Sequence, residues 1–129
     1  MRVAHILYDF VDTRGQSVIR TWVRSERLTG RDIGQLNQKL DMLRVNGMGL
    51  QPKLLAGPIA KHIYKLKIHT DRTFRPMLCK GPFSMETEFT LLLGAIEVNF
   101  KLDHDPSDAI LNRATLLADR NRRKPNERY

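Results

Sequence analysis

Positively charged side chains gather in one short stretch of the chain. Residues 61–80 carry six Lys or Arg against a single Asp. Lys65, Lys67 and His69 alternate there with apolar residues, and a strand places alternate side chains on one face, about 7 Å apart. Arg75 follows in the next apolar segment. Cations at this spacing suit successive phosphate oxygens or one pentacoordinate phosphate, so the stretch predicts a site for a polyanion.

Each of these four residues also has a structural interpretation. Lys65 and Lys67 could line a solvated strand face, and a single histidine such as His69 is more often structural than a proton carrier. A guanidinium within an apolar strand needs a partner, so Arg75 contacts either a phosphate of the polyanion or a carboxylate. The candidate carboxylates in the following segments are Glu86, Glu88 and Glu97.

The whole chain of 129 residues has a formal net charge of +8, unevenly distributed. Residues 111–129 hold six Lys or Arg against two acids, whereas residues 81–110 hold one against six. A basic field of this kind attracts nucleic acid, an anionic membrane or an acidic protein. We expect further phosphate contacts from Arg72, Lys80, Arg113, Arg120, Arg122 and Arg123. The last three could instead form a solvated helix end.

Several kinds of site find no support in the sequence. Cys79 is the only cysteine and lies in an apolar segment, which predicts a buried, unreactive thiol and excludes an internal disulfide. The absence of CxxC, HxH and HExxH patterns leads us to expect neither a metal nor another cofactor. There is no signal-peptide pattern and no apolar run near the ~18 residues of a membrane span. We therefore expect a cytoplasmic protein without a membrane partner.

The first half of the chain predicts a strand followed by two amphipathic helices. β-branched and aromatic residues mark the strand, and apolar residues one helical turn apart mark the helices. Thr29 and Asp32 resemble a capping box at the start of the second helix. The expected bounds are residues 3–11 for the strand, residues 17–28 for the first helix with Ser17 as N-cap, residues 29–46 for the second helix, and residues 48–58 for a loop.

The second half predicts three strands in an antiparallel meander, the last of them apolar enough to be buried. Their expected bounds are residues 61–70, 71–80 and 89–96. Pro76 lies inside the second of these, and because proline belongs at an edge or a bulge, we expect a break there.

Asp105 and Pro106 start a C-terminal helix, whose inner stripe is expected to be Ile110, Ala114 and Leu117. Residues 124–129 are expected to form a disordered tail. One domain, residues 1–123, therefore has the order β-α-α-β-β-β-α. This order predicts an α+β fold, in which a helical hairpin and a C-terminal helix pack against a small antiparallel sheet.

The element order resembles that of the RelE/HigB toxins, in particular their phage-derived HigB-like branch. The residues that carry the resemblance are Ile63-Tyr64-Lys65-Leu66-Lys67, Phe74-Arg75 and Leu91-Leu92-Leu93-Gly94-Ala95, followed by a basic terminal helix. It covers roughly residues 3–123. The resemblance implies the toxin of a toxin–antitoxin pair, which docks in the ribosomal A site, cleaves mRNA and is held inactive by a cognate antitoxin.

The resemblance also implies a mechanism. The ribose 2′-hydroxyl attacks the adjacent phosphodiester without a metal, while side chains transfer protons and cations stabilise the phosphorane. Arg75 matches the family's strand arginine, and Lys65 and Lys67 match its charged pair. We therefore expect the catalytic residues to be Arg75, Lys65, Lys67 and His69. Where the family has a polar residue and lysines after the last strand, this chain has Leu93, Glu97 and Val98. This departure keeps two other functions open: a non-catalytic inhibitor of a protein target, as in the gyrase-directed ParE relatives, and a phage-derived nucleic-acid-binding module.

Overall fold

The computed structural model describes residues 4–129, and Val3, the predicted first residue of the first strand, lies outside the described residues. The elements are β1 (Ile6–Phe10), α1 (Val18–Ser25), α2 (Gly30–Asn46), the short 3₁₀ helix η1 (Gly47–Leu50), β2 (Leu55–Ala60), β3 (Ile63–Leu66), β4 (Ile68–His69), β5 (Thr73–Lys80), β6 (Glu88–Val98), β7 (Lys101–Leu102), α3 (Pro106–Ala118) and β8 (Arg123–Pro125). None of the helices within residues 4–129 has the length and apolar character needed to cross a membrane.

The strands form one sheet in the order β2-β3-β5-β6-β1-β8, with β4 beside β5 and β7 beside β6. β1 runs parallel to β6, whereas β6 and β5, like β5 and β3, are antiparallel. The α+β class is therefore confirmed. The expected sheet was small and antiparallel, whereas the observed sheet is mixed and larger. Strands β2 and β8 extend it beyond the predicted strands.

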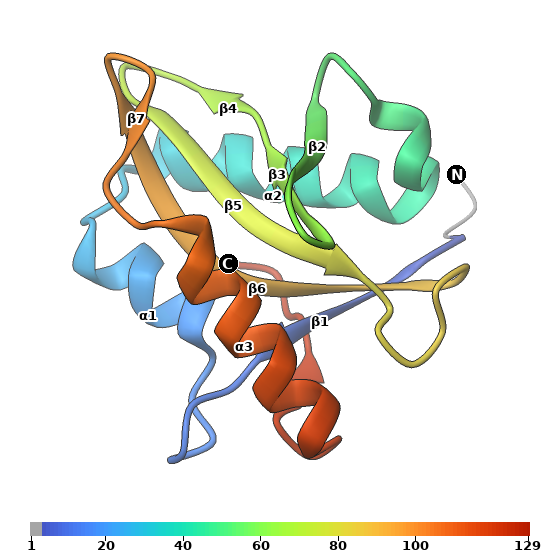
Figure 1. Cartoon of the computed structure of the whole chain (residues 1–129). Helices are drawn as coiled ribbons and strands as arrows, with labels where there is room; N and C mark the ends of the chain where they lie inside the picture. Colours follow the sequence, from blue (N-terminus) through green and yellow to red (C-terminus); the bar gives the residue numbers. More distant parts are fainter. Residues whose placement is uncertain (1–3) are drawn as a thin grey trace.

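The sheet is covered on both faces. Helices α1 and α2 lie behind it and α3 lies in front, as Figure 1 shows. One core cluster fills the space under α1 and α2 and includes Ile19, Leu36 and Leu40. A second cluster, which includes Ala109 and Leu116, lies under α3. The domain therefore has three layers.

β6 lies at the centre of these layers. Its residues 88–95 are all buried, and its side chains reach both core clusters. Phe89 and Leu91 belong to the cluster under α1 and α2, whereas Leu92 and Ala95 belong to the cluster under α3. The nearly continuous apolar run of this strand predicted its burial, because a strand covered on both faces has no solvent-exposed side.

The predicted helix starts are confirmed by hydrogen bonds. The Ser17 hydroxyl accepts from the backbone N–H of Arg20 at the start of α1. Thr29 and Asp32 form the reciprocal capping box of α2. Asp105 caps α3, and Pro106 occupies its first turn. Each cap satisfies backbone donors that a helix start leaves without an intrahelical partner.

Three details of the prediction are wrong. β2 lies partly within the expected loop of residues 48–58. The predicted inner stripe of α3 has the wrong phase, because Ala109 and Leu116 are buried while Ala114 and Leu117 are exposed. β5 also runs unbroken through Pro76, and the register shifts one residue later. No residue of β3 or β4 pairs with Pro76, so the partner strand is interrupted there instead.

The C-terminal segment is ordered, which corrects the prediction of a disordered tail at residues 124–129. β8 pairs antiparallel with β1, and the Asn126 side chain donates to the buried carboxylate of Asp9 at 2.8 Å. The Asn37 side chain both accepts from and donates to the backbone of Tyr129. The segment has no apolar periodicity, and its order comes from partners 90 or more residues away, which local sequence signals do not reveal.

Removal of residues 124–129 should destabilise the domain by roughly 2–4 kcal/mol, because Asp9 loses a hydrogen-bond donor and β1 loses its outer partner strand. The measurement is the midpoint of chemical denaturation. Glu127→Ala, which changes an exposed side chain of the same segment, should leave the midpoint unchanged. An unaltered midpoint for the truncated chain would contradict the structural role of the tail.

A close contact between α1 and β6 fixes the position of the first helix. A Cβ atom built on Gly94 would lie 2.1 Å from Cδ2 of the Trp22 ring, so the indole rests on glycine backbone. We expect Gly94→Ala to lower the free energy of unfolding by about 2–3 kcal/mol through overpacking. Gly34→Ala is the matched control, since it meets open space within α2 and should stabilise by roughly 0.5–1 kcal/mol. Equal midpoints for the two variants would contradict the contact.

Candidate functional site

The structure brings two of the four predicted catalytic residues together around a carboxylate. The Nζ atom of Lys65 lies 3.1 Å from Oε1 of Glu97, and Nη2 of Arg75 lies 3.0 Å from Oε2. The two cations therefore hold separate oxygens of one carboxylate. We call these three residues the charged cluster. Their side chains are 12–20% exposed, so the cluster is largely covered and still reachable from solvent.

Neighbouring strands of the sheet assemble the charged cluster. Arg75 on β5 pairs with Ala95 on β6, which places Glu97 one side-chain repeat further along the same face. Lys65 comes from β3, on the other side of β5, where it pairs with Met77. Three adjacent strands thus each contribute one charged side chain. Their backbones are fixed by the sheet, so the geometry does not depend on a loop.

The electrostatics of the cluster keep Glu97 ionised. Burial alone would raise the pKa of its carboxyl group, but the Lys65 hydrogen bond and the charges of Arg75 and Lys65 outweigh it and lower the pKa from its ordinary value. The Nε atom of Arg75 is buried without a hydrogen-bond partner. Its Nη1 reaches the carbonyl oxygens of Ile68 and Phe74 only at 3.4 Å.

The other two predicted catalytic residues do not join the cluster. The Lys67 ammonium donates to the carbonyl oxygen of Pro52 at 2.9 Å. The imidazole of His69 lies 2.7 Å from the Thr73 hydroxyl, at the turn between β4 and β5, and is exposed. Lys67 and His69 therefore lie outside the charged cluster.

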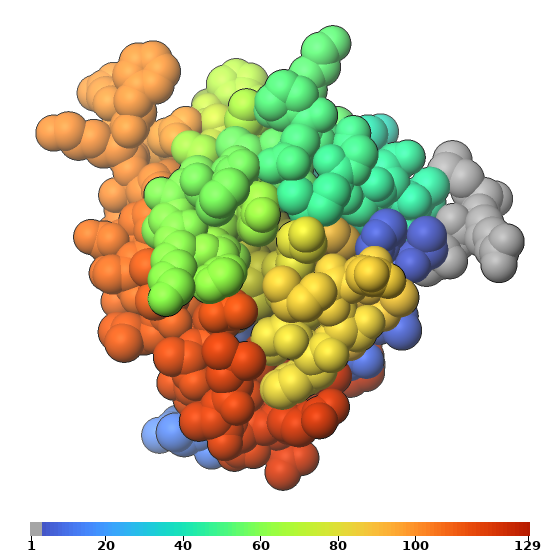
Figure 2. Space-filling model, turned by 45° about the vertical axis from the view of Figure 1, so that its right-hand side comes forward, coloured from blue at the N-terminus to red at the C-terminus, as the bar shows by residue number. Residues whose placement is uncertain are grey.

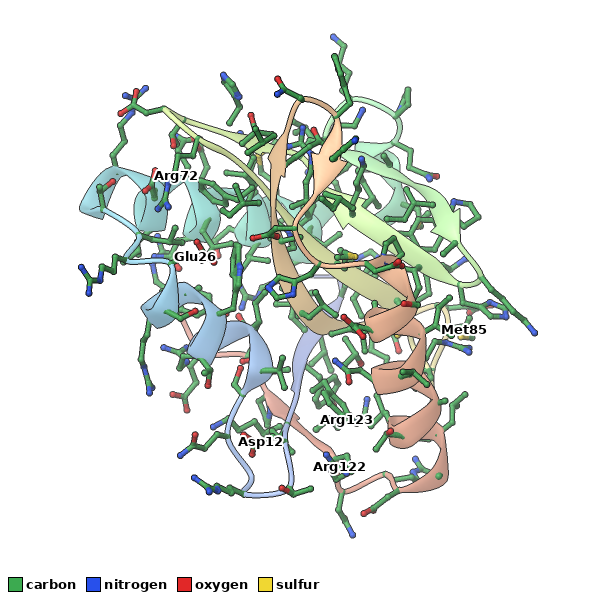
Figure 3. The ribbon with its side chains drawn as sticks, turned by 60° about the vertical axis from the view of Figure 1, so that its left-hand side comes forward. Asp12, Glu26, Arg72, Met85, Arg122 and Arg123 are labelled. Carbon is green, nitrogen blue, oxygen red and sulfur yellow. The ribbon has the colours of Figure 1, made fainter. Side chains whose placement is uncertain are left out.

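Some of the residues predicted to bind nucleic acid have structural partners, and others are open to solvent. Arg72 donates twice to the carbonyl oxygen of Glu26 at 3.1 Å and lies 3.4 Å from a carboxylate oxygen of Asp32, so it joins the end of α1 to the start of α2 (Figure 3). Lys80 borders a small cavity of about 150 Å³ with His62, Tyr64 and Met85. The guanidinium of Arg72 thus has a structural task, whereas Lys80 is partly exposed.

The C-terminal arginines contact aromatic rings. Arg123 stacks over Tyr8 at 3.8 Å and pairs with Glu88 at 2.8 Å, and Arg122 donates to the carbonyl oxygen of Val11. Figure 3 shows both at the end of the molecule where β8 begins. The Cζ atom of Arg120 lies 4.2 Å from the centroid of the Phe83 ring, and the Arg120 side chain is exposed to solvent. Arg113, with a buried Nε that lacks a partner, is half-buried on α3.

Among the described residues we find neither a reactive thiol nor a metal site. Burial raises the pKa of the Cys79 thiol to about 11, as expected for an unreactive cysteine. Within the part of the chain that the structure describes, no three His, Cys, Asp or Glu side chains are grouped so that they could hold a metal ion. The charged cluster is the place where two of the predicted site residues share one carboxylate.

Comparison of the chain with protein-family models, with curated proteins and with solved structures finds no match. Only the residues and their geometry can therefore indicate a function. Sequence reasoning identified Lys65 and Arg75 but treated Glu97 only as a possible ion-pair partner or as a departure from a family pattern. No local signal in the sequence gives its place in the cluster, because the pairing of Arg75 with Ala95 is what puts residue 97 diagonally across from the arginine.

Glu97→Gln should lower the free energy of unfolding at neutral pH by about 1–3 kcal/mol, because two largely covered cations lose their counter-charge. The pKa of Glu97 is lowered by folding, so its stabilisation is present above the ordinary value of 4.5 and is lost as the pH falls through the lowered folded-state pKa. The measurement is denaturation of both proteins from pH 7 to below pH 4.5. We expect the difference to shrink in acid, and a constant difference would contradict the ion pairs. Glu86→Gln, at an exposed position, is the control.

Proposed function

We propose that this protein is a RelE/HigB-like toxin that cleaves mRNA on the ribosome, without a metal, through attack of the ribose 2′-hydroxyl. The observation that carries the proposal is the charged cluster. An ionised carboxylate lies within 3.1 Å of an ammonium and a guanidinium, on a rigid sheet. This is the set of groups that such a transfer requires: a base, a donor and a fixed positive charge.

Each member of the cluster has a distinct task in this proposal. Glu97 accepts the proton of the 2′-hydroxyl as the 2′ oxygen forms its bond to phosphorus. Arg75 binds two equatorial oxygens of the phosphorane, because its planar guanidinium presents paired donors and keeps its charge. The bond from phosphorus to the 5′ oxygen then breaks, and Lys65 gives that oxygen a proton. The products are a 2′,3′-cyclic phosphate and a 5′-hydroxyl.

Further cations elsewhere on the molecule suit a large anionic substrate. Lys67 follows β3, Lys80 ends β5, and Arg120 lies exposed beyond the end of α3. A net charge of +8 favours association with RNA and with the ribosome. In this proposal the protein acts in the cytoplasm, and a cognate antitoxin with an acidic or amphipathic segment covers the basic surface.

One observation favours a second function, a non-catalytic inhibitor of the same fold that binds a protein or a nucleic acid. Glu97 neutralises charge that a phosphate would otherwise meet, and the Arg75 side chain is only 12% exposed. An ion pair of this kind also forms where its sole effect is structural. The two functions differ in whether RNA is cut.

The test is cleavage of mRNA on translating ribosomes, with melting curves for every variant. We expect Arg75→Lys to remain folded and to cleave about 100–1000 times more slowly, because an ammonium replaces a paired donor with a point charge. Glu97→Gln should lose a factor of about 100 or more, because the amide cannot accept the proton.

Asp71→Asn serves as the control, since Asp71 is an exposed acid paired with Arg31 outside the cluster. It should cleave like the unchanged protein. Normal cleavage by Arg75→Lys and Glu97→Gln would remove the cluster from the active site. If the unchanged protein leaves RNA intact at every concentration tested, the non-catalytic function replaces the proposed one.

A further inference from the structure

The hairpin that joins β6 to β7 carries an aromatic ring that touches almost nothing in the chain. Phe100 at its tip is 98% exposed, and Val98 beside it is 62% exposed. Figure 2 shows this hairpin, in orange, standing out from the body of the molecule. Single exposed apolar residues are common. A phenylalanine with nearly all of its surface in water, at the end of a projecting hairpin, gains none of the burial energy that such a side chain offers.

The backbone of this turn is strained by the residues it carries. Asn99 has φ 51° and Phe100 has φ 65°, so both residues of the two-residue turn adopt left-handed conformations. Such turns join the strands of a hairpin well and favour the sequence Asn-Gly, since glycine meets no penalty at positive φ. A bulky residue at this position is uncommon. Phe100 therefore weakens the fold locally, and no contact within the described chain compensates.

The same hairpin begins at the charged cluster. Glu97 pairs with Leu102 and Val98 pairs with Lys101, so Phe100 lies in the turn, three residues after Glu97. Three residues of chain span at most about 10 Å. A nucleotide whose phosphate lies at the cluster would thus have a neighbouring base within reach of the ring. Lys101, which is exposed, adds a positive charge beside it.

We propose that Phe100 is a stacking platform for an unpaired base of the RNA whose phosphate binds at the charged cluster. This inference rests on the proposed function and adds a substrate-positioning residue to it. Stacking on an aromatic ring is largely independent of base identity and requires single-stranded RNA. Both faces of the ring are open, so the base needs no rearrangement of the protein to reach it.

The test uses short single-stranded RNA that carries the fluorescent base 2-aminopurine, bound to protein with Glu97→Gln so that the RNA stays intact. We expect Phe100→Gly to weaken binding about 10-fold and to abolish the fluorescence quenching that stacking produces. Phe100→Trp should retain both. The melting temperature of Phe100→Gly should rise by about 3 °C, because the turn gains its preferred residue. Val98→Ala is the matched control on the same hairpin and should bind like its parent.

A higher melting temperature of Phe100→Gly together with weaker RNA binding supports the proposal. If the ring only supported the fold, its removal would not raise the melting temperature while lowering the RNA affinity. Unchanged RNA affinity in Phe100→Gly, with cleavage intact in the protein that retains Glu97, overturns the stacking role and leaves the proposed function standing. If Phe100→Gly instead loses only a protein partner, the ring serves a protein interface and the inference is wrong. A fall in melting temperature would likewise show that the ring supports the fold. If the unchanged protein neither binds nor cuts RNA, the proposed function is wrong, and the stacking role is wrong with it.

Discussion

Burial of β6 on both of its faces is the constraint on which the rest of the structure depends. Its apolar side chains point to opposite sides, so neither face can be left to solvent. Helices α1 and α2 cover one face of the strand, and α3 covers the other. Gly94 lets the Trp22 ring approach the strand closely enough to complete the first layer. The parallel partner β1 then needs a neighbour of its own, which the C-terminal segment supplies as β8.

The distribution of charge shows why a net charge is a poor measure of binding surface. Several of the cations that make the sequence basic serve the fold. Arg72 ties α1 to α2, and Arg123 lies between an aromatic ring and the buried carboxylate of Glu88. These guanidiniums are held by carbonyl and carboxylate oxygens of the chain itself. Fewer cations are therefore available to a polyanion than the net charge of the sequence suggests, and the available ones are those with exposed side chains.

The sequence predicted what local patterns determine. Ser17, Thr29 and Asp105 are caps whose hydrogen bonds lie within three residues, so their helices could be placed from the chain alone. The parallel pairing of β1 with β6 and the order of the tail depend on residues about 80 to 120 positions apart, for which the sequence offers no local signal. The same division holds in the site. Arg75 stood out as a cation in an apolar strand, whereas the position of Glu97 opposite it followed from strand register.

The place of Glu97 along β6 gives the site its physical character. Residues 88–95 are buried, Ile96 and Glu97 are half-buried, and Val98 is exposed. The carboxylate thus lies at the boundary between the covered sheet and the projecting hairpin. If Glu97 lay in the buried part of β6, its charge would require costly desolvation. If it lay in the exposed turn, water would screen its attraction to Arg75 and Lys65. At the boundary the ion pairs keep Glu97 ionised, and the three side chains are still partly exposed to solvent. The proposed function requires this compromise of Glu97, and the hairpin that continues from it carries a residue, Phe100, that adds nothing to the core.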